Sequence, residues 1–167
     1  MSDAERRHVL YADGAARGNP GPAGAGALLL DDRGNVVAEL TKFLGHATNN
    51  VAEYNGLILG LEEALRRGIR DIDVRLDSLL VVEQMCGRWK IKHPRLQPLA
   101  RHAGELLAKF PRHEIRHVPR EENTRADALS NRAIDASGAD APTGGVAGAA
   151  GGAQARVAGD SPPAKSG

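Results

Sequence analysis

The sequence has few of the features that characterise secreted and membrane proteins. Its 167 residues include a single cysteine, Cys86, so no disulfide can form within the chain. No apolar run approaches the ~20 residues that cross a bilayer. The first ten residues contain no apolar stretch of signal-peptide length. We therefore expect a cytoplasmic, monomeric protein that does not associate with membranes.

Aromatic residues are also scarce, at 3% of the chain, and the last of the five is Phe110. In residues 136–167, 24 of the 32 residues are Ala, Gly, Pro or Ser, and two valines are the only larger apolar side chains. Such a segment buries too little apolar surface to offset the entropy lost on ordering it. We expect one folded domain over residues 6–135 and a disordered tail or linker over residues 136–167.

The formal net charge of +1 hides an uneven distribution along the chain. Residues 1–87 hold nine Lys and Arg against 13 Asp and Glu, a net of −4. Residues 88–125 hold ten against four, a net of +6, together with four histidines. A basic segment is often only a solvated face, but it is also what a protein that binds a polyanion requires.

Hydrophobic periodicity predicts an α/β fold. The predicted strands alternate apolar residues and the predicted helices repeat them at three- and four-residue spacing. Turn-rich residues between the second and third strands indicate an antiparallel hairpin. The expected strands are 8–13, 24–30, 35–44, 72–76 and 113–118, and the expected helices begin at Asn50, Ser78, Leu96 and Thr124. This order predicts a five-stranded mixed sheet, an antiparallel meander followed by parallel strands, flanked by helices.

Four acidic residues fall at the ends of these elements. Asp13 ends the first strand, Glu53 lies in the first turn of a helix, Asp77 follows the fourth strand, and Asp127 lies in the first turn of the last helix. Ligand sites of α/β folds gather where strands give way to loops, so the four could meet at one edge of the sheet. Clustered carboxylates repel one another, and Mg²⁺ or Mn²⁺ is the natural counter-ion for oxygen ligands.

Each acid also has a purely structural interpretation. Glu53 follows Asn50 at the spacing of a capping box. Asp77 could cap the following helix, and Asp127 could stabilise the positive end of a helix dipole. Asp13, in an Asp-Gly pair, could shape a turn.

The glycine-rich segment that follows Asp13 fits no common phosphate-binding motif. GNPGPAGAG lacks a third glycine at the position that a dinucleotide-binding fingerprint requires, and no Gly-Lys-Ser/Thr follows it, as a P-loop would need.

Four segments in order resemble type 1 ribonuclease H: YADGAARGNPGPAGAGALL, TNNVAEYNGLILGLEEAL, VRLDSLLVVEQMCGRWKIK and IRHVPREENTRADALSNRAID. The likeness covers roughly residues 8–135. It is greatest to the compact bacterial and archaeal branch without a basic protrusion, because Trp89 follows the helix after Asp77 too soon for an extra helix. The resemblance implies a ribonuclease H-like fold and an endonuclease that cleaves the RNA strand of RNA/DNA hybrids, leaving 5′-phosphate and 3′-hydroxyl ends.

The resemblance also implies roles for particular residues. Asp13, Glu53, Asp77 and Asp127 match the carboxylates that bind two Mg²⁺ ions, with Mn²⁺ as the alternative. His117 matches a loop histidine of the catalytic site, although it could equally alternate with Ile115 on a partly buried strand face.

Further positions match family residues that contact nucleic acid, and they carry short polar side chains: Asn19, Thr48, Asn49, Asn50 and Asn123. Such side chains can contact backbone and 2′-hydroxyl groups. Asn123 could alternatively, or in addition, cap the last helix.

Trp89, Lys90 and Lys92 lie in the basic segment and are candidates for contacts with the DNA strand. The alternative for Trp89 is a half-buried anchor at a helix end. Two other functions remain open: a hybrid-binding module without catalysis, tethered to a partner domain, and a nuclease of broader specificity that includes double-stranded RNA.

Overall fold

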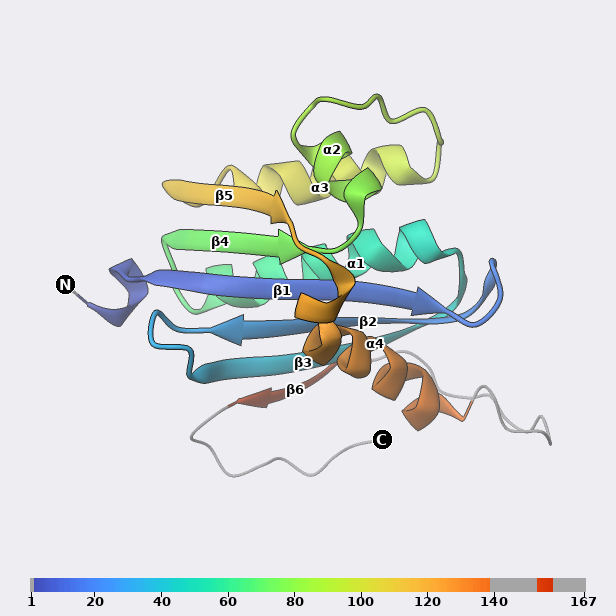
Figure 1. The fold of residues 1–167 in the computed structure, drawn as a ribbon, viewed down its shortest axis with the longest axis horizontal. Coiled ribbons are helices and arrows are strands. Elements are labelled where there is room, and N and C mark those ends of the chain that lie inside the picture. The colour runs from blue at the N-terminus through green and yellow to red at the C-terminus, as the bar shows by residue number, and fades with distance from the viewer. Residues whose placement is uncertain (1, 139–152, 158–167) are drawn as a thin grey trace.

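The computed structural model describes residues 2–138 and 153–157, which form one mixed sheet with helices on both faces (Figure 1). The strands are β1 (Arg7–Ala16), β2 (Gly21–Leu30), β3 (Val36–Ala47), β4 (Asp71–Leu76), β5 (Arg112–His117) and β6 (Ala153–Val157). The helices are α1 (Asn49–Arg66), α2 (Leu79–Met85), α3 (Leu96–Leu107) and α4 (Thr124–Ser137), with short 3-10 helices η1 (Asp3–Glu5) and η2 (Arg120–Glu122).

The strand order is β5-β4-β1-β2-β3-β6. β1, β2 and β3 form an antiparallel meander, and β4 and β5 continue the sheet parallel to β1. The predicted five-stranded mixed sheet is therefore confirmed. β6 adds a sixth strand, antiparallel to the outer edge of β3, which the sequence did not predict.

The first hairpin is longer than predicted. β1 continues past Asp13 to Ala16, and β2 begins at Gly21, so only residues 17–20 form the loop. The pairing of Ala16 with Ala23 extends the ladder through the glycine-rich segment. Because this segment has small side chains, helices can pack closely on both of its faces.

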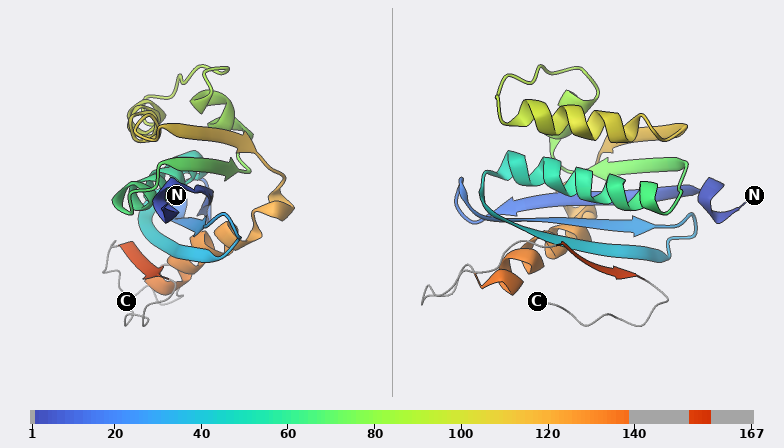
Figure 2. Two further views of the ribbon diagram at one scale, coloured as in Figure 1. Left: turned by 90° about the vertical axis from the view of Figure 1, so that its left-hand side faces the viewer. Right: turned by 180° about the vertical axis from the view of Figure 1, so that it is seen from behind.

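α1 and α3 lie side by side on one face of the sheet, and α4 crosses the other face (Figures 1 and 2). The Thr48 hydroxyl accepts a hydrogen bond from the Val51 amide at the start of α1, and Gly68, with φ of 78°, follows its end. The main core lies between the sheet and α1 and α3, where Tyr54, Leu57 and Phe110 are fully buried. None of the helices in the described part of the chain is long and apolar enough to cross a membrane.

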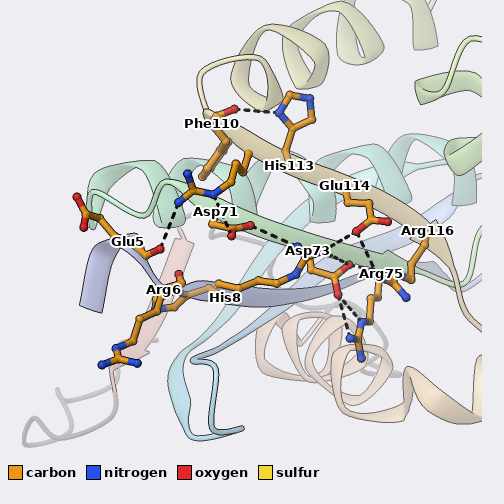
Figure 3. A network of polar contacts seen from close by, with 12 residues as sticks. Glu5, Arg6, His8, Asp71, Asp73, Arg75, Phe110, His113, Glu114 and Arg116 are labelled. Carbon is orange, nitrogen blue, oxygen red and sulfur yellow. Dashed lines mark hydrogen bonds and ion pairs between the residues drawn. The ribbon is translucent and has the colours of Figure 1, made fainter. Parts of the chain in front are cut away.

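α4 covers β1, β2 and β3, whereas ion pairs cover the part of the same face formed by β4 and β5 (Figure 3). Asp73, only 2% exposed, accepts hydrogen bonds from the guanidinium groups of Arg75 (2.9 Å) and Arg116 (3.1 Å). Arg75 also donates to the Tyr11 hydroxyl and lies 5.5 Å from the centre of its ring. This network satisfies a buried charge where no helix covers the sheet.

The boundary expected between domain and tail falls inside α4, which continues to Ser137 before Gly138 adopts φ of 74°. Of the tail expected to be disordered, residues 153–157 form β6 on the edge of β3. Residues 139–152 and 158–167 lie outside the described residues. The division into a domain over 6–135 and a tail over 136–167 therefore stays a prediction.

Candidate metal centre

Three of the four predicted acids, Asp13, Glu53 and Asp77, meet at one point of the sheet. Asp13 lies on β1, Glu53 on α1, and Asp77 directly after β4. One carboxylate oxygen from each lies within 4.8 Å of the others. The parallel ladder between β1 and β4 ends with the pair Ala12 and Leu76. Asp13 is therefore the next residue along β1, and Asp77 is the first residue after β4. Asp13 thus lies within β1, not at its end as predicted, and marks where β1 and β4 separate.

Two glycines allow Glu53 to reach Asp13. A methyl group on Gly14 would lie 2.1 Å from the carbonyl carbon of Ala52, and one on Gly56 would lie 2.3 Å from the carbonyl oxygen of Asp13. The backbones of β1 and α1 therefore touch directly, because neither glycine has a side chain to separate them. This contact fixes the distance between the strand that carries Asp13 and the helix that carries Glu53.

Asp127 reaches the same centre from the opposite face of the sheet. α4 packs on β2 at Gly24 and Gly26, where added methyl groups would each lie 2.5 Å from the backbone of Ser130. The Asp127 side chain lies within hydrogen-bonding reach of Asp13. The glycines of the segment that fits no phosphate-binding motif thus serve to dock a helix.

The capping interpretations of Glu53 and Asp77 are wrong. Thr48 caps α1, five residues before Glu53, so the two do not form a capping box. Ser78 caps α2, and its hydroxyl accepts a hydrogen bond from the Val81 amide. Glu53 instead faces Asp13 and the Gly14 amide, and both oppose the effect of burial on the pKa of Glu53.

Burial and mutual repulsion raise the pKa of two of the acids. Asp13 is 4% exposed, and its burial, together with the charges of Glu53 and Asp77, raises its pKa to about 10. Burial also raises the pKa of Glu53 to about 7, opposed by its hydrogen bonds with Asp13 and the Gly14 amide. A divalent cation would relieve this repulsion, and the donor set of carboxylate oxygens suits Mg²⁺ or Mn²⁺. The three closest acids, with Asp127 beside Asp13, could hold such an ion.

Arg120 is a charged residue of this centre that sequence reasoning missed. It lies on η2, between β5 and α4, and its charge lowers the pKa of Glu53. It therefore counteracts part of the burial effect on that carboxylate. The only signal in the sequence was its place seven residues before Asp127, within a segment already rich in Arg and Glu.

His117 lies at the end of β5, paired in register with Leu76. It shares a face of β5 with Ile115, as the structural interpretation expected, but its side chain is exposed. Its charge acts on Glu83 of α2, whose pKa is lowered mainly by Arg88 and further by His117. A catalytic role for His117 stays a prediction.

Asn123 is 1% exposed, which does not fit the predicted contact with nucleic acid. Nor does its side chain cap α4, although it occupies the N-cap position. Its side-chain nitrogen instead donates to the backbone carbonyl of Ala12, 3.0 Å away and next to Asp13, while the backbone carbonyl of Asn123 accepts from the Asp127 amide. Asn123 therefore ties the start of α4 to the strand that carries Asp13.

The other predicted substrate-binding residues around α1 form a small polar cluster at its start. The Asn19 side chain accepts from the Asn49 amide (3.0 Å), and the Asn49 side chain accepts from the Ala16 amide (3.1 Å). Thr48 caps the helix between them, and Asn50 is exposed. These bonds join the tip of the first hairpin to the helix that carries Glu53.

The residues of the basic segment that are predicted to contact DNA are Trp89, Lys90 and Lys92. They lie in the connection between α2 and α3, and not in the polar cluster at the start of α1. Trp89 is 46% exposed, which fits the half-buried anchor as well as a contact with nucleic acid, so its role stays a prediction. Lys90 and Lys92 are exposed and form no ion pair within residues 2–138. Several arginines of the basic segment, in contrast, are paired: Arg88 with Glu83, Arg112 with Asp71, and Arg116 with Asp73 and Glu114.

The fold and the acidic centre define an α/β protein with a candidate carboxylate site for a divalent cation. A family model described as "Reverse transcriptase-like" matches residues 11–133. Over 133 residues the chain is 50% identical to the ribonuclease HI of Halobacterium salinarum, covering 80% of this chain and 67% of that protein. This chain belongs to the ribonuclease H family.

A second relative is longer than this chain. The sequence is 52% identical over 130 residues to a bifunctional protein of Mycobacterium tuberculosis, but the alignment covers only 36% of that protein, so the chain spans about a third of its length. The structure of its N-terminal ribonuclease H domain has a TM-score of 0.77, with 50% identity, covering 79% of this chain and 96% of that one. LC11-RNase H1, solved in complex with an RNA/DNA hybrid, has a TM-score of 0.73, with 42% identity, covering 77% and 97%.

Proposed function

We propose that the protein hydrolyses the RNA strand of RNA/DNA hybrids endonucleolytically, leaving 5′-phosphate and 3′-hydroxyl ends. The observation that carries this proposal is the convergence of Asp13, Glu53 and Asp77 within 4.8 Å, at the point where β1 and β4 separate. Membership of the ribonuclease H family supports the reaction, and the hybrid in the LC11-RNase H1 complex supports the substrate.

The four carboxylates would hold two Mg²⁺ ions, with Mn²⁺ as the alternative. When bound, such ions supply an activated water and stabilise charge on the leaving 3′ oxygen. Asp13 lies on β1 and Asp77 directly after the neighbouring strand β4, and the backbone contact at Gly14 and Gly56 holds α1, which carries Glu53, against β1. The protein's part is to keep these oxygens close together despite their repulsion.

Two basic side chains have proposed roles around this centre. Arg120, through its charge, favours the ionised form of Glu53 and so keeps it able to bind a cation. His117, exposed at the end of β5, is proposed to move a proton near neutral pH, where an imidazole changes charge.

Selection of RNA would depend on the polar cluster at the start of α1. Asn19, Thr48, Asn49 and Asn50 present short polar groups next to the helix that carries Glu53. Because a 2′-hydroxyl both donates and accepts, amide and hydroxyl side chains can distinguish RNA from DNA. Contacts of this kind go to sugar and phosphate, so we expect cleavage without sequence preference.

The test compares wild type with Asp13→Asn on a labelled RNA/DNA hybrid in Mg²⁺. The variant keeps the shape of the side chain but removes a charged ligand, so cleavage should fall below detection while hybrid binding persists. Asp32→Asn is a matched control, because Asp32 pairs with Arg6 and lies away from the acidic centre. Unchanged cleavage by Asp13→Asn would show that the acidic centre is not catalytic.

The same assay separates the two other functions. A module that only binds hybrids would leave the RNA intact in wild type under every metal condition. A nuclease of broader specificity would also cut double-stranded RNA at a comparable rate in a parallel digestion.

A further inference from the structure

Residues 88–95, which we call the basic loop, lie in the connection between α2 and α3 and have no regular secondary structure. Four successive residues of the basic loop are nevertheless held in place by hydrogen bonds. The amides of Arg88 and Trp89 both donate to the carbonyl of Glu83, at 2.9 and 3.2 Å. The next two residues are held through their backbone carbonyls. The side-chain amide of Gln84 donates to the Lys90 carbonyl (3.3 Å), and the side-chain amide of Gln97 donates to the Ile91 carbonyl (2.9 Å).

At Lys90 and Ile91, side-chain amides therefore replace the backbone hydrogen bonds that would hold a helix or strand. Gln84 comes from α2 and Gln97 from α3, so the basic loop is bound to both helices that it connects. An open groove of about 460 Å³ lies beside these bonds, bordered by Met85, Ile91 and Ala100. Ile91 packs against the main core beside this groove, so the basic loop is held both by that contact and by the hydrogen bonds.

Gln84 is the buried member of the pair, at 9% exposure, and it bonds in two directions. The Tyr54 hydroxyl, fully buried on α1, donates to its Oε1 at 2.7 Å. The Lys90 carbonyl can only accept, so it directs the Nε2 of Gln84 toward the basic loop and leaves Oε1 for Tyr54. A continuous set of hydrogen bonds thus runs from α1, next to Glu53, through α2 to the basic loop.

The basic loop carries exposed groups suited to a polyanion. Trp89 is half exposed, and Lys90 and Lys92 form no ion pair within residues 2–138, so both ammonium groups are available to an external phosphate. A lysine held at its backbone presents its charge at a defined place, which lowers the entropy lost on binding.

We propose that Gln84 is a positioning residue that holds the basic loop in the conformation in which Trp89 and Lys90 contact the nucleic acid. The proposal extends the proposed function, since it takes the RNA/DNA hybrid as the ligand. Gln84 acts through Lys90 and does not touch the acidic centre. Its loss should therefore weaken substrate binding while leaving the cleavage step unchanged.

The experiment uses Gln84→Met, which keeps the length of the side chain but removes both hydrogen bonds. Tyr54→Phe is the matched control, because it removes the buried partner on α1 and leaves the bond to Lys90 in place. Gln97→Met changes an exposed residue, so this variant should fold even if Gln84→Met does not. It should have a smaller effect of the same kind.

The first readout needs no substrate. Trp89 is the only tryptophan in the chain, so its fluorescence reports on the basic loop alone. Freed from Gln84, the loop should expose Trp89 further, and quenching by acrylamide should rise in Gln84→Met and not in Tyr54→Phe. Equal quenching in wild type and in both glutamine variants would overturn the proposal.

The second readout is the kinetics on a hybrid. Loss of one hydrogen bond that orders the binding loop should raise KM roughly fivefold in Gln84→Met, with kcat within about twofold of wild type. An equal rise of KM in Tyr54→Phe, or a fall in kcat alone, would mean that Gln84 only stabilises the fold. Because quenching is measured without nucleic acid, failure of the chain to cleave hybrids would refute the proposed function and leave the result on the loop intact.

Discussion

At the acidic centre β1 and α1 touch backbone to backbone at Gly14 and Gly56, whereas the basic loop is held to α2 and α3 by hydrogen bonds, including those from the side chains of Gln84 and Gln97. The acidic centre must hold like charges together, and a direct backbone contact cannot relax to separate them. The basic loop is proposed to meet an external polyanion, and its hydrogen bonds hold it beside an open groove. The two regions show different ways of positioning charge, and each can be disturbed separately.

Among the variants that test this comparison, the largest effect is expected from Gly56→Ala at the backbone contact. Its methyl group would lie 2.3 Å from the Asp13 carbonyl oxygen, so α1 must move away from β1. Overpacking of this kind costs about 1–3 kcal/mol of stability. A displacement of about 1 Å at a catalytic group lowers activity on the order of 100-fold. Denaturant unfolding and hybrid cleavage measure the two effects.

The matched control for this change is Gly104→Ala. Gly104 lies in α3, and an added methyl group there meets nothing within 4 Å. This variant should gain about 0.5–1 kcal/mol of stability because alanine favours the helix. Its activity should not change. If Gly56→Ala retained full activity, the close contact would not be what positions Glu53.

The second prediction concerns stability against pH without metal. Burial raises the pKa of Asp13 to about 10 in the folded protein, against 3.8 for an ordinary aspartate. The folded state then binds more protons than the unfolded state between these values, so stability falls as pH rises, by up to ~1.4 kcal/mol per unit for one proton. In EDTA, Tm should therefore decrease between pH 5 and pH 9.

Two controls test the cause of this slope. Asp13→Asn cannot ionise, so it should flatten the slope and should be more stable than wild type at pH 8 without metal. Mg²⁺ should raise the Tm of wild type at pH 8, since an ion that binds only the folded state stabilises it. A metal-free wild type whose Tm rises from pH 5 to pH 9 would contradict the repulsion inferred at this centre.

The third prediction concerns Asn123, which joins β1 to α4. Asn123→Ala removes the bond to Ala12 and should cost about 1–2 kcal/mol, because a buried carbonyl loses its partner. Since Asp127 then loses its fixed distance from Asp13, kcat should fall by on the order of tenfold with KM little changed. Asn55→Ala, which removes a bond within α1 only, is the control. A larger change in KM than in kcat would instead support the predicted contact with nucleic acid.

The sequence predicted β1 to β5, the four helices and the acidic residues because periodicity and family motifs are local signals. It could not reveal the close contacts at Gly14 and Gly56, since a glycine in a strand or helix looks the same whether or not a backbone lies against it. It also could not reveal that Arg112 and Arg116 pair with Asp71 and Asp73. Part of the basic segment therefore does not form a basic surface, because β5 lies beside β4 and the aspartates of β4 pair with its arginines.

The pairing of these arginines distinguishes them from the lysines of the basic loop. Lys90 and Lys92 form no ion pair within residues 2–138, so they remain available where three arginines of the same segment are paired. Replacing both lysines by alanine should weaken hybrid binding at low salt and reduce the slope of log affinity against log salt by about two. Arg112→Ala should leave that slope unchanged, because its charge is already paired with Asp71. An unchanged slope in the lysine variant would remove the basic loop from the interface.

The smallest effect is expected from deleting residues 139–167. The deletion keeps α4 and Gly138 and removes β6, which pairs with β3 on the far side of the sheet from β4. The acidic centre and the basic loop draw no residue from this segment, so cleavage should stay within about twofold of wild type, less than the loss of one hydrogen bond would cause. Steady-state kinetics on the hybrid measure this, and denaturant unfolding measures what β6 contributes to stability. A large loss of cleavage with unchanged stability would assign the tail a part in the reaction.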